Sequence, residues 1–377
     1  MGEEQQHQPV RPFESEPVMS RTPFISVVMP CYNVERYVAA ALESVASQDL
    51  DDWEIVAVDD CSTDATLSVL RDAASRDGRI RVFALDENRG VSAARNFGLT
   101  CAQGTHVAFL DPDDAYAPGL FAWLDRVVKE RDPHMIAWGV REVYSNEAGA
   151  VVLEKDVVMP CRSCCTPQEV HAAILELERL TLFGYAWNKL YRRDLLDEAD
   201  AKFPCTSINE DVFFNMAVAG SLRSLEVVGE ALYRYARRDV QRRTSLTARF
   251  LPDYFDLSAR RVEGMLGLYR AWGEETQEVK GVLGTIYARY VLSALQRNCD
   301  PRAGMDRNKR RDWLEALYER PLSRELLEHA DPDGLLARVC ARLLRRRSRT
   351  AVLLAARAVY AVNVLAPGLF SRLKQSR

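Results

Sequence analysis

Residues 24–64 decide the fold, because they contain two apolar segments that each run into a polar turn. The first segment and its turn read FISVVMPCYN at residues 24–33, and the second read WEIVAVDDCSTD at residues 53–64. Short, continuous apolar runs of this kind are typical of parallel strands that helices cover on both faces. This stretch therefore predicts an α/β fold.

The same pattern continues along the chain. Apolar segments recur at Arg81–Ala84 and His106–Leu110, and segments of helical periodicity lie between the strands at about 35–47, 64–75 and 91–102. Four strands with three helical crossovers indicate a nucleotide-binding type of half-domain, whose ligand lies at the carboxyl ends of the strands. Polar residues follow all four segments, so we expect a binding site at that edge of the sheet.

Composition divides the chain into three parts. Residues 1–23 are polar and contain four prolines, which predicts a disordered leader that is neither a signal peptide nor a membrane span. Residues 24–250 are expected to form one domain with two halves, 24–116 and 117–250. Its second half is expected to contain helices near 117–131 and 167–180, a strand at Met135–Val140 and a hairpin to about Met159. Residues 251–377 are expected to be a helical region.

Charge is distributed unevenly over the chain. No Asp or Glu follows Asp333, whereas ten Lys and Arg do, and without those ten charges the formal net charge of -4 falls to -14. An acidic body argues against nucleic acid as a partner, because a protein that binds the phosphate backbone needs positive charge over its docking face. The basic tail needs its own explanation.

The tail from about Leu335 onward combines arginines with an apolar helical stripe. The segment Ala351–Phe370 is interrupted by Arg357, Asn363 and Pro367, which makes it a poor bilayer span. Three roles remain open for the tail: association with an anionic membrane surface, a contact in a homo-oligomer, and a helix packed on the rest of the protein.

Nine cysteines and the lack of a secretory signal predict free thiols in a reducing compartment. We therefore expect a cytoplasmic protein, peripheral on the inner face of the cell membrane if the tail binds there. The cluster Cys161, Cys164 and Cys165, with Cys205, lacks a second CxxC or a His pair, so free thiols are favoured over structural zinc.

Asp111 and Asp113 follow the fourth apolar segment. Two carboxylates at this spacing can present oxygen ligands to Mg²⁺ or Mn²⁺, although the same residues also suit a solvated turn. A phosphatase with an aspartyl-phosphate intermediate also uses Asp-x-Asp, but at its first strand and before Thr or Val. Ala115 follows Asp113-Asp114 here, which counts against that alternative.

Seven motifs, taken in order, resemble the family 2 glycosyltransferases, which are inverting, sugar-nucleotide-dependent enzymes with the GT-A fold. They are Pro30-Cys31-Tyr32-Asn33, Val58 to Asp64, Asn88 to Gly98, Phe109 to Asp114, Trp187 to Arg193, Glu210 to Phe214 and Tyr233-x-Tyr235-x-x-Arg238. The resemblance covers about residues 24–250, so that 24–116 becomes the nucleotide-binding half and 117–250 the acceptor-side half. It implies a mixed, mostly parallel sheet flanked by helices, with a helical C-terminal extension.

The resemblance implies a nucleotide site in which Asp60 accepts the uracil imide hydrogen and Tyr32 stacks on the ring. Its full set of nucleotide contacts is Pro30, Tyr32, Asp60, Asn88, Arg95, Asp111, Arg237 and Arg238. Structural alternatives stay open: Tyr32 packs on the first helix, Asp60 caps the second, and Arg95 is an ion-pair partner. The insertion of Arg242 and Arg243 before Ser245 also leaves open which arginine meets the diphosphate.

The resemblance further implies that Asp113 binds Mn²⁺ or Mg²⁺, with a shell completed by diphosphate and water, because the only His after Asp211 is His329. Asp211 is implied as the general base, supported by Glu210. Asp114, Trp187 and Lys189 are implied on the acceptor side, with a place in the core as the alternative for Trp187.

The expected function is therefore transfer of a sugar, most simply from a UDP-sugar, to a glycan or lipid-linked acceptor in cell-surface polysaccharide or glycolipid synthesis. A nucleotidyltransferase would need a Gly-rich phosphate loop with Lys or Arg near the first strand, which the segment after Met29 lacks. A catalytically silent sugar-nucleotide or glycan-binding scaffold would not need Asp60, Asp113 and Asp211 together.

Overall fold

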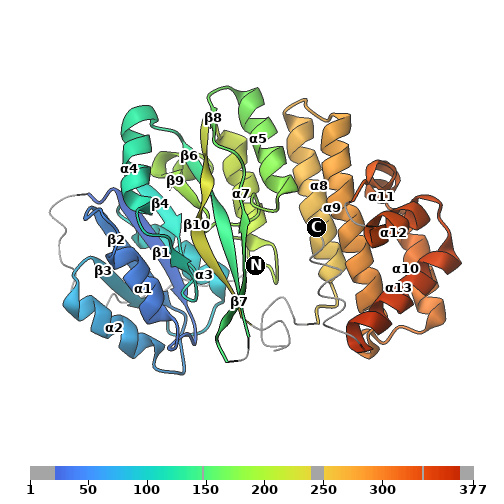
Figure 1. The fold of residues 1–377 in the computed structure, drawn as a ribbon, viewed down its shortest axis with the longest axis horizontal. Helices are drawn as coiled ribbons and strands as arrows, with labels where there is room; N and C mark the ends of the chain where they lie inside the picture. Colours follow the sequence, from blue (N-terminus) through green and yellow to red (C-terminus); the bar gives the residue numbers. More distant parts are fainter. Residues whose placement is uncertain (1–21, 147, 239–249, 333–334, 366–377) are drawn as a thin grey trace, which may run out of the picture. The chain divides into compact units, whose positions relative to one another are not determined.

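The structure is a computed structural model that describes residues 22–146, 148–238, 250–332 and 335–365 (Figure 1). The expected leader therefore lies almost wholly outside the described residues. The chain forms two compact units, Met1–Gln241 and Arg242–Arg377. We call them the sheet unit and the helical unit and describe each by itself.

The first half of the sheet unit contains four parallel strands in the order β3-β2-β1-β4. These strands are β1 (Ile25–Cys31), β2 (Trp53–Asp59), β3 (Ile80–Ala84) and β4 (His106–Phe109), and their crossover helices are α1 (Val38–Ala46), α2 (Thr66–Arg76) and α3 (Val91–Cys101). Every residue of β1 and β2 is buried, as the continuous apolar runs predict. The four strands and three helices expected from the sequence are confirmed.

Two helix starts show how local chemistry sets the element bounds. Helix α2 begins at Thr66, two residues later than expected, because an Asp64 carboxylate oxygen accepts hydrogen bonds from the Thr66 N–H and hydroxyl in a turn before the helix. Helix α3 begins after Gly90, whose φ of +85° is a conformation that glycine tolerates best.

The second half of the sheet unit adds antiparallel pairings. Strand β9 (Lys189–Arg192) inserts antiparallel between β4 and β6 (Met135–Ser145), and β10 (Leu225–Arg238) runs parallel to β6. Antiparallel strands β5 (Ala115–Tyr116), β7 (Val151–Val157) and β8 (Arg162–Cys164) complete a ten-stranded mixed sheet. Helices α4 (Leu120–Arg131), α5 (Pro167–Arg179), α6 (Arg193–Glu198) and α7 (Glu210–Ser221) belong to this half. The expected fold class is confirmed.

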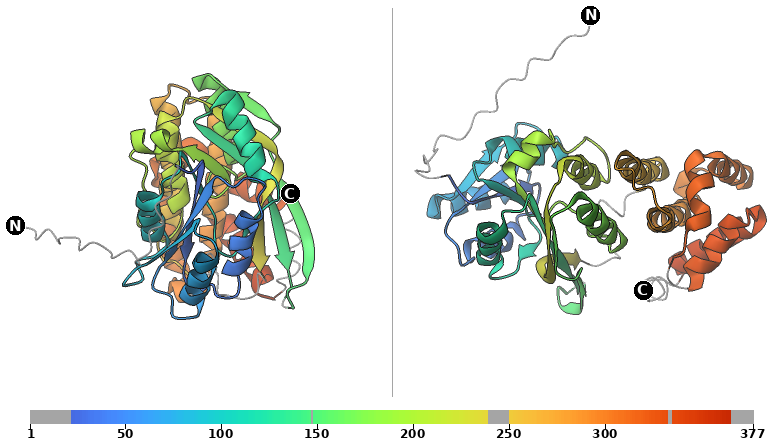
Figure 2. Two further views of the ribbon diagram at one scale, coloured as in Figure 1. Left: turned by 90° about the vertical axis from the view of Figure 1, so that its left-hand side faces the viewer. Right: turned by 90° about the horizontal axis from the view of Figure 1, so that it is seen from above.

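Strands β6 and β7 form a hairpin in which β7 lies at the edge of the sheet, whereas β6 also pairs with β9 and β10 (Figure 2). Strand β7 pairs with β6 along one edge, and no second strand among the described residues pairs with its other edge. Residues 151–156 are all exposed, and Val152 is 62% exposed.

Aromatic side chains fix α7 against the sheet. The Phe109 ring of β4 makes edge contacts with Tyr191, Phe203 and Phe214 at centroid distances of 6.0, 5.1 and 5.6 Å. Edge-to-face packing of buried rings at such distances stabilises one geometry over others. The N-terminus of α7, which carries Glu210 and Asp211, is thereby held at a defined place beside the end of β4.

The helical unit contains α8 (Tyr254–Ala271), α9 (Gln277–Arg297), α10 (Arg307–Glu319), α11 (Pro321–Leu326), α12 (Leu335–Arg345) and α13 (Arg349–Leu365). The apolar stripe of α12 faces inward, with Cys340, Ala341 and Leu344 buried. These three side chains are therefore part of the core of the helical unit, whereas Val339 of the same helix is 43% exposed. None of the described helices is long and apolar enough to cross a bilayer.

Candidate active site

The turns after β1 and β2 are joined by side-chain hydrogen bonds. The Asn33 N–H donates to the Ser62 hydroxyl at 3.0 Å, and the Asn33 amide oxygen accepts the Thr63 N–H at 2.8 Å. Tyr32, on the first of these turns, is 46% exposed, so nearly half of its surface is open to solvent. Pro30 is buried in β1.

Asp60 is buried at the end of β2 and holds the loop before α3. One of its carboxylate oxygens accepts the Arg89 N–H and the other accepts the Gly90 N–H, both at 2.8 Å. The alternative that Asp60 caps the second helix is wrong, because these two bonds go to another loop and the N-cap of α2 is Ala65. Asn88 lies exposed in the loop that Asp60 holds.

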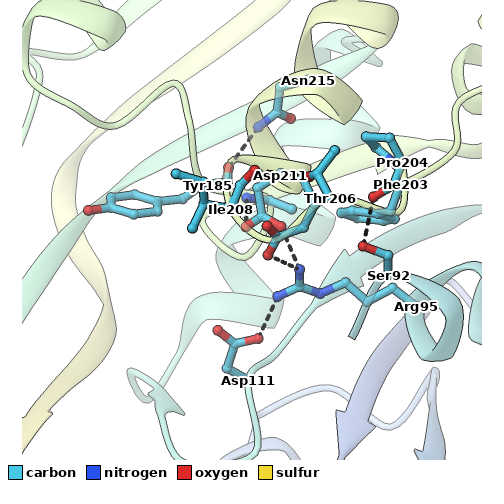
Figure 3. A network of polar contacts seen from close by, with 12 residues as sticks. Ser92, Arg95, Asp111, Tyr185, Phe203, Pro204, Thr206, Ile208, Asp211 and Asn215 are labelled. Atoms are coloured by element: carbon cyan, nitrogen blue, oxygen red, sulfur yellow. Dashed lines mark hydrogen bonds and ion pairs between the residues drawn. The ribbon is translucent and has the colours of Figure 1, made fainter. Parts of the chain in front are cut away.

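A buried ion cluster joins residues that are far apart in the sequence (Figure 3). The Arg95 guanidinium, 3% exposed, lies 2.8 Å from Asp111 Oδ1, 2.5 Å from Asp211 Oδ1 and 3.5 Å from Glu210 Oε1. We call these four residues the Arg95 cluster. Arg95 is thus an ion-pair partner, one of the two roles that the sequence left open, and it links the end of β4 to the start of α7.

The Arg95 cluster has more negative than positive groups, and this shifts its protonation. Burial raises the pKa of Asp211 to about 6, Arg95 opposes the shift, and the nearby Glu210 and Asp111 add to it. Burial alone would lower the pKa of Arg95, but Asp211, Asp111 and Glu210 outweigh burial and raise it. A carboxylate whose pKa lies nearer neutrality is a better proton acceptor.

The second oxygen of Asp211 accepts the Ala186 N–H at 3.2 Å. Ala186 lies in the loop 182–188, to which both Lys189 and Asn215 donate hydrogen bonds. The Lys189 ammonium donates to the Leu182 and Tyr185 carbonyl oxygens and to the Asn188 amide oxygen. These bonds fix the loop that orients Asp211.

Lys189 is completely buried, and burial lowers the pKa of its amine to about 7. The expectation that Lys189 lines an acceptor-facing surface is therefore corrected: its charge points into the protein, where the loop carbonyl groups replace water. Lys189 acts on the site through the loop.

Asn215 was not singled out by the sequence, yet it holds the same loop from α7. Its amide nitrogen donates to the carbonyl oxygens of Phe183 at 2.8 Å and Tyr185 at 3.1 Å, and its amide oxygen accepts the Tyr191 hydroxyl proton at 2.6 Å. Asn215 lies one helical turn after Asp211, so both face the same loop. A polar side chain one turn from an implied catalytic residue was the signal that could have identified it.

Asp114 is also buried and has structural partners. Its carboxylate accepts the Tyr233 hydroxyl proton at 2.9 Å and the Ala236 N–H at 2.8 Å, so it ties β10 to the turn after β4. Burial raises its pKa, and Asp113 and Asp111 add to the shift. The structure thus places Asp114 inside the protein and not on an acceptor surface. Asp113, beside it, is half-buried.

Trp187 is the middle ring of a three-ring stack. Its centroid lies 4.2 Å from the Tyr185 ring and 4.0 Å from the Tyr233 ring, and the residue is 3% exposed. The structure therefore gives Trp187 the core position that the sequence left as an alternative. Tyr185, which the sequence analysis did not identify, is the half-exposed end of the stack. The aromatic residues at positions 185 and 187, two apart in the sequence, were the pattern that could have pointed to it.

Arg237 is held on the strand by Glu142 and Tyr235. Its Nη2 lies 2.7 Å from Glu142 Oε1, and its guanidinium lies over the Tyr235 ring at 4.5 Å from the centroid. Arg238 ends β10, and its side chain lies outside the described residues, as do Arg242, Arg243 and Ser245.

Over the described part of the chain, no group of three or more His, Cys, Asp and Glu residues is arranged to hold a metal ion by itself. One Asp111 oxygen is engaged by Arg95, and Asp113 stands near it at the strand end. These two carboxylates fit a cation only if other ligands, such as phosphate oxygens and water, complete its shell. The nine cysteines form no disulfide.

A sheet with acidic residues at the carboxyl ends of its parallel strands, extended by an antiparallel half that brings in α7, is the architecture of the GT-A fold. Residues 26–199 match the model of Glycosyl transferase family 2. The matched segment lies in the sheet unit, which is therefore similar to the glycosyltransferases of this family.

Named glycosyltransferases and polysaccharide-synthesis proteins are also similar to this chain. The chain is 30% identical over 216 residues to the uncharacterized glycosyltransferase EpsJ of Bacillus subtilis, which covers 56% of this chain and 61% of that protein. It is 41% identical over 102 residues to the succinoglycan biosynthesis protein ExoO of Rhizobium meliloti, 27% of this chain and 29% of that protein. The chain thus spans about three fifths of the length of EpsJ.

The fold extends further than the sequence similarity. The structure of S. aureus TarS 1–349 in complex with UDP-GlcNAc superposes with a TM-score of 0.60 at 20% identity, over 89% of this chain and 90% of that one. At this identity the likeness concerns the fold alone.

Proposed function

We propose that the chain transfers a sugar from a nucleotide-sugar donor, a UDP-sugar in the simplest case, to an acceptor hydroxyl with inversion at the anomeric carbon. The observation that carries the proposal is the Arg95 cluster. It joins Asp111 of the Asp-x-Asp segment, where a donor diphosphate would lie, to Asp211, a carboxylate suited to accept a proton.

In this proposal Asp211 is the general base. It takes the proton of the acceptor hydroxyl while the hydroxyl oxygen bonds to the anomeric carbon and the bond from that carbon to the diphosphate oxygen breaks. Arg95 and the Ala186 N–H each engage one Asp211 oxygen, which fixes the direction of the carboxylate. One base and one in-line displacement give inversion. Glu210 supports Asp211 through their shared arginine.

The donor would lie along the ends of β1 to β4. We propose that Tyr32 stacks on the base, that Asp60 accepts its imide hydrogen, and that Asn88, exposed in the adjacent loop, contacts the nucleotide. Pro30 would shape the turn, and Arg237 or Arg238 would approach the diphosphate. A Mn²⁺ or Mg²⁺ ion held by Asp113, with Asp111 nearby, would neutralise charge on the departing diphosphate.

We propose a glycan or lipid-linked acceptor in cell-surface polysaccharide synthesis. Support comes from ExoO, which is named for succinoglycan biosynthesis. Tyr185, at the half-exposed end of the aromatic stack and one residue before Ala186, is a better candidate than Trp187 for contact with a sugar ring.

The test is a transfer and donor-hydrolysis screen of UDP-, GDP- and dTDP-sugars with Mn²⁺, Mg²⁺ or EDTA. We expect one donor to be consumed with release of the nucleoside diphosphate, in a reaction that EDTA and Asp113→Asn both suppress. Asp211→Asn should reduce transfer by about 10²–10⁴-fold and change UDP affinity only a few-fold, because the base acts on the acceptor. Release of sugar 1-phosphate, with transfer of the nucleoside monophosphate, would indicate a nucleotidyltransferase. Binding without turnover would indicate a scaffold.

A further inference from the structure

Helix α13 exposes an apolar stripe along one side. Its members recur at spacings of four, three and four residues, which places them on one face of the helix: Leu354, Ala358, Ala361 and Leu365. Leu354 is 60% and Leu365 83% exposed, whereas Val352 and Ala356 of the same helix are buried in the helical unit. Packing against described residues explains why the buried side of α13 is apolar. It does not explain why the exposed stripe is apolar.

Arginines gather at the N-terminal end of this stripe. Arg342, Arg345, Arg346 and Arg347 are all exposed on α12 and the turn after it. None of the four has an ion pair to an acidic residue within the described ranges, while Arg349 lies 3.5 Å from Glu315. Because no Asp or Glu follows Asp333, the sequence supplies no later acid to offset this charge.

A hollow lies at the same corner. Arg347, Ser348, Arg349 and Thr350 line it from the turn and from the first residues of α13, and its volume is about 280 Å³. Thr350 lies one helical turn before Leu354, so the hollow continues the line of the stripe. The free N–H groups at a helix start and the arginines together favour an anionic group such as a phosphate.

The other wall of the hollow belongs to α10, which contributes Glu315, Tyr318 and Glu319. Both carboxylates have arginine partners, Arg349 for Glu315 and Arg324 for Glu319. Tyr318 is 5% exposed, and its hydroxyl has no hydrogen-bond partner among the described residues. The acidic wall is therefore neutralised, and a buried hydroxyl beside the hollow remains unsatisfied.

We propose that the helical unit docks on an anionic phospholipid surface, with the α13 stripe in the interfacial layer and the arginines of the α12–α13 corner on the headgroup phosphates. Exposed apolar side chains beside unopposed arginines suit this surface, because apolar burial and attraction to anionic lipid add together. A second copy of the chain fits less well, since it would bring two such arginine groups close together. The inference does not depend on the proposed transfer reaction.

The experiment is co-sedimentation of the full chain with vesicles of phosphatidylglycerol, and of phosphatidylcholine as the neutral comparison. We expect binding to phosphatidylglycerol vesicles at about 0.1 M salt, little binding to neutral vesicles, and release at about 1 M salt, where charges are screened within a few ångströms. Failure of the full chain to bind phosphatidylglycerol at the lower salt would overturn the proposal.

Two variants separate the stripe from the arginines. Leu354→Asn and Arg345→Glu/Arg346→Glu should each weaken binding at least tenfold. Their matched controls, Val152→Asn at a 62% exposed site and Arg307→Glu/Arg311→Glu on α10 with the same charge change, should bind like the unmodified chain. Equal losses in the controls would mean that net charge or hydropathy, and not this surface, decides binding. A dimer by light scattering that Leu354→Asn dissociates would instead make the stripe a contact between copies.

Discussion

Protonation of the Asp211 carboxylate should change the reaction rate. A general base works in its ionised form, and burial raises the pKa of Asp211 to about 6. We therefore expect kcat to be constant above this pH and to fall as the pH drops through it, tenfold per pH unit. An acid limb near the ordinary value of 3.8 would contradict the assignment.

A substitution at Arg95 tests the same dependence of kcat on pH. Its positive charge opposes the raised pKa of Asp211, so Arg95→Gln should raise that pKa further and move the acid limb of kcat to higher pH. A loss of activity without movement of the limb would indicate that Arg95 only maintains the structure. A thermal melt of the variant, compared with that of the unmodified chain, establishes that it is folded.

Lys189 tests the loop that orients Asp211. Lys189→Met keeps the length of the side chain but removes three donated hydrogen bonds inside the protein. Because the loop then loses its fixed position, we expect kcat to fall about tenfold or more, which corresponds to about 1–3 kcal/mol of lost positioning. The KM for the donor should change little. Lys155→Met, on the exposed strand β7, is the control and should leave both constants unchanged.

At the scale of elements, Gly98 sets how closely α3 approaches the sheet. A Cβ at this position would lie 2.5 Å from Val28 Cγ1 on β1, a distance that the packed strand cannot accommodate without moving. Gly98→Val should therefore destabilise the chain by about 1–3 kcal/mol, measured by urea denaturation. Gly78→Val, where no atom lies within 4 Å of the added Cβ, should have a much smaller effect.

The elements that sequence predicts best are those whose burial is uniform. The strands β1 and β2 are buried on both faces, so their apolar runs are continuous and their ends are marked by Asp59 and Asn33. Strand β9 gives no such signal, because it is four residues long and enters the sheet between β4 and β6. Its pairing depends on contacts between segments far apart in the chain.

The site residues also differ in how well the sequence predicts them. Asp60 and Asp111 could be found because they follow apolar strands, where the sheet itself collects polar groups. Lys189 and Asn215 can be found in the sequence, but their role in holding the loop 182–188 is visible only in the fold, because their partners there include backbone carbonyl groups. Carbonyl groups carry no mark in the sequence, so a buried lysine that binds them looks like a lysine that faces a ligand.

At the scale of the whole molecule, residues 335–365 are a structural part of the helical unit. Cys340, Leu344 and Val352 are buried, and α12 and α13 both contact α9. A chain that ends at Pro332 should therefore lose more helical circular dichroism than the removed residues account for, because a core is exposed. It should still bind UDP through the sheet unit. Full retention of the remaining helicity would show that α8 to α11 fold without the tail.

The open edge of β7 affects whether copies of the chain associate at high concentration. An unpaired strand with exposed valines invites a second copy to pair with it, and charged residues on the strand are one defence. The antiparallel register that pairs two copies along all of Val151–Val157 sets Glu154 opposite the Glu154 of the other copy, where like charges repel. Glu154→Val should therefore favour self-association in light scattering, whereas Glu130→Val on α4 should not. Glu154, which lies 3.0 Å from Arg234 Nη2 within its own chain, would in that case oppose association between copies, a role separate from catalysis.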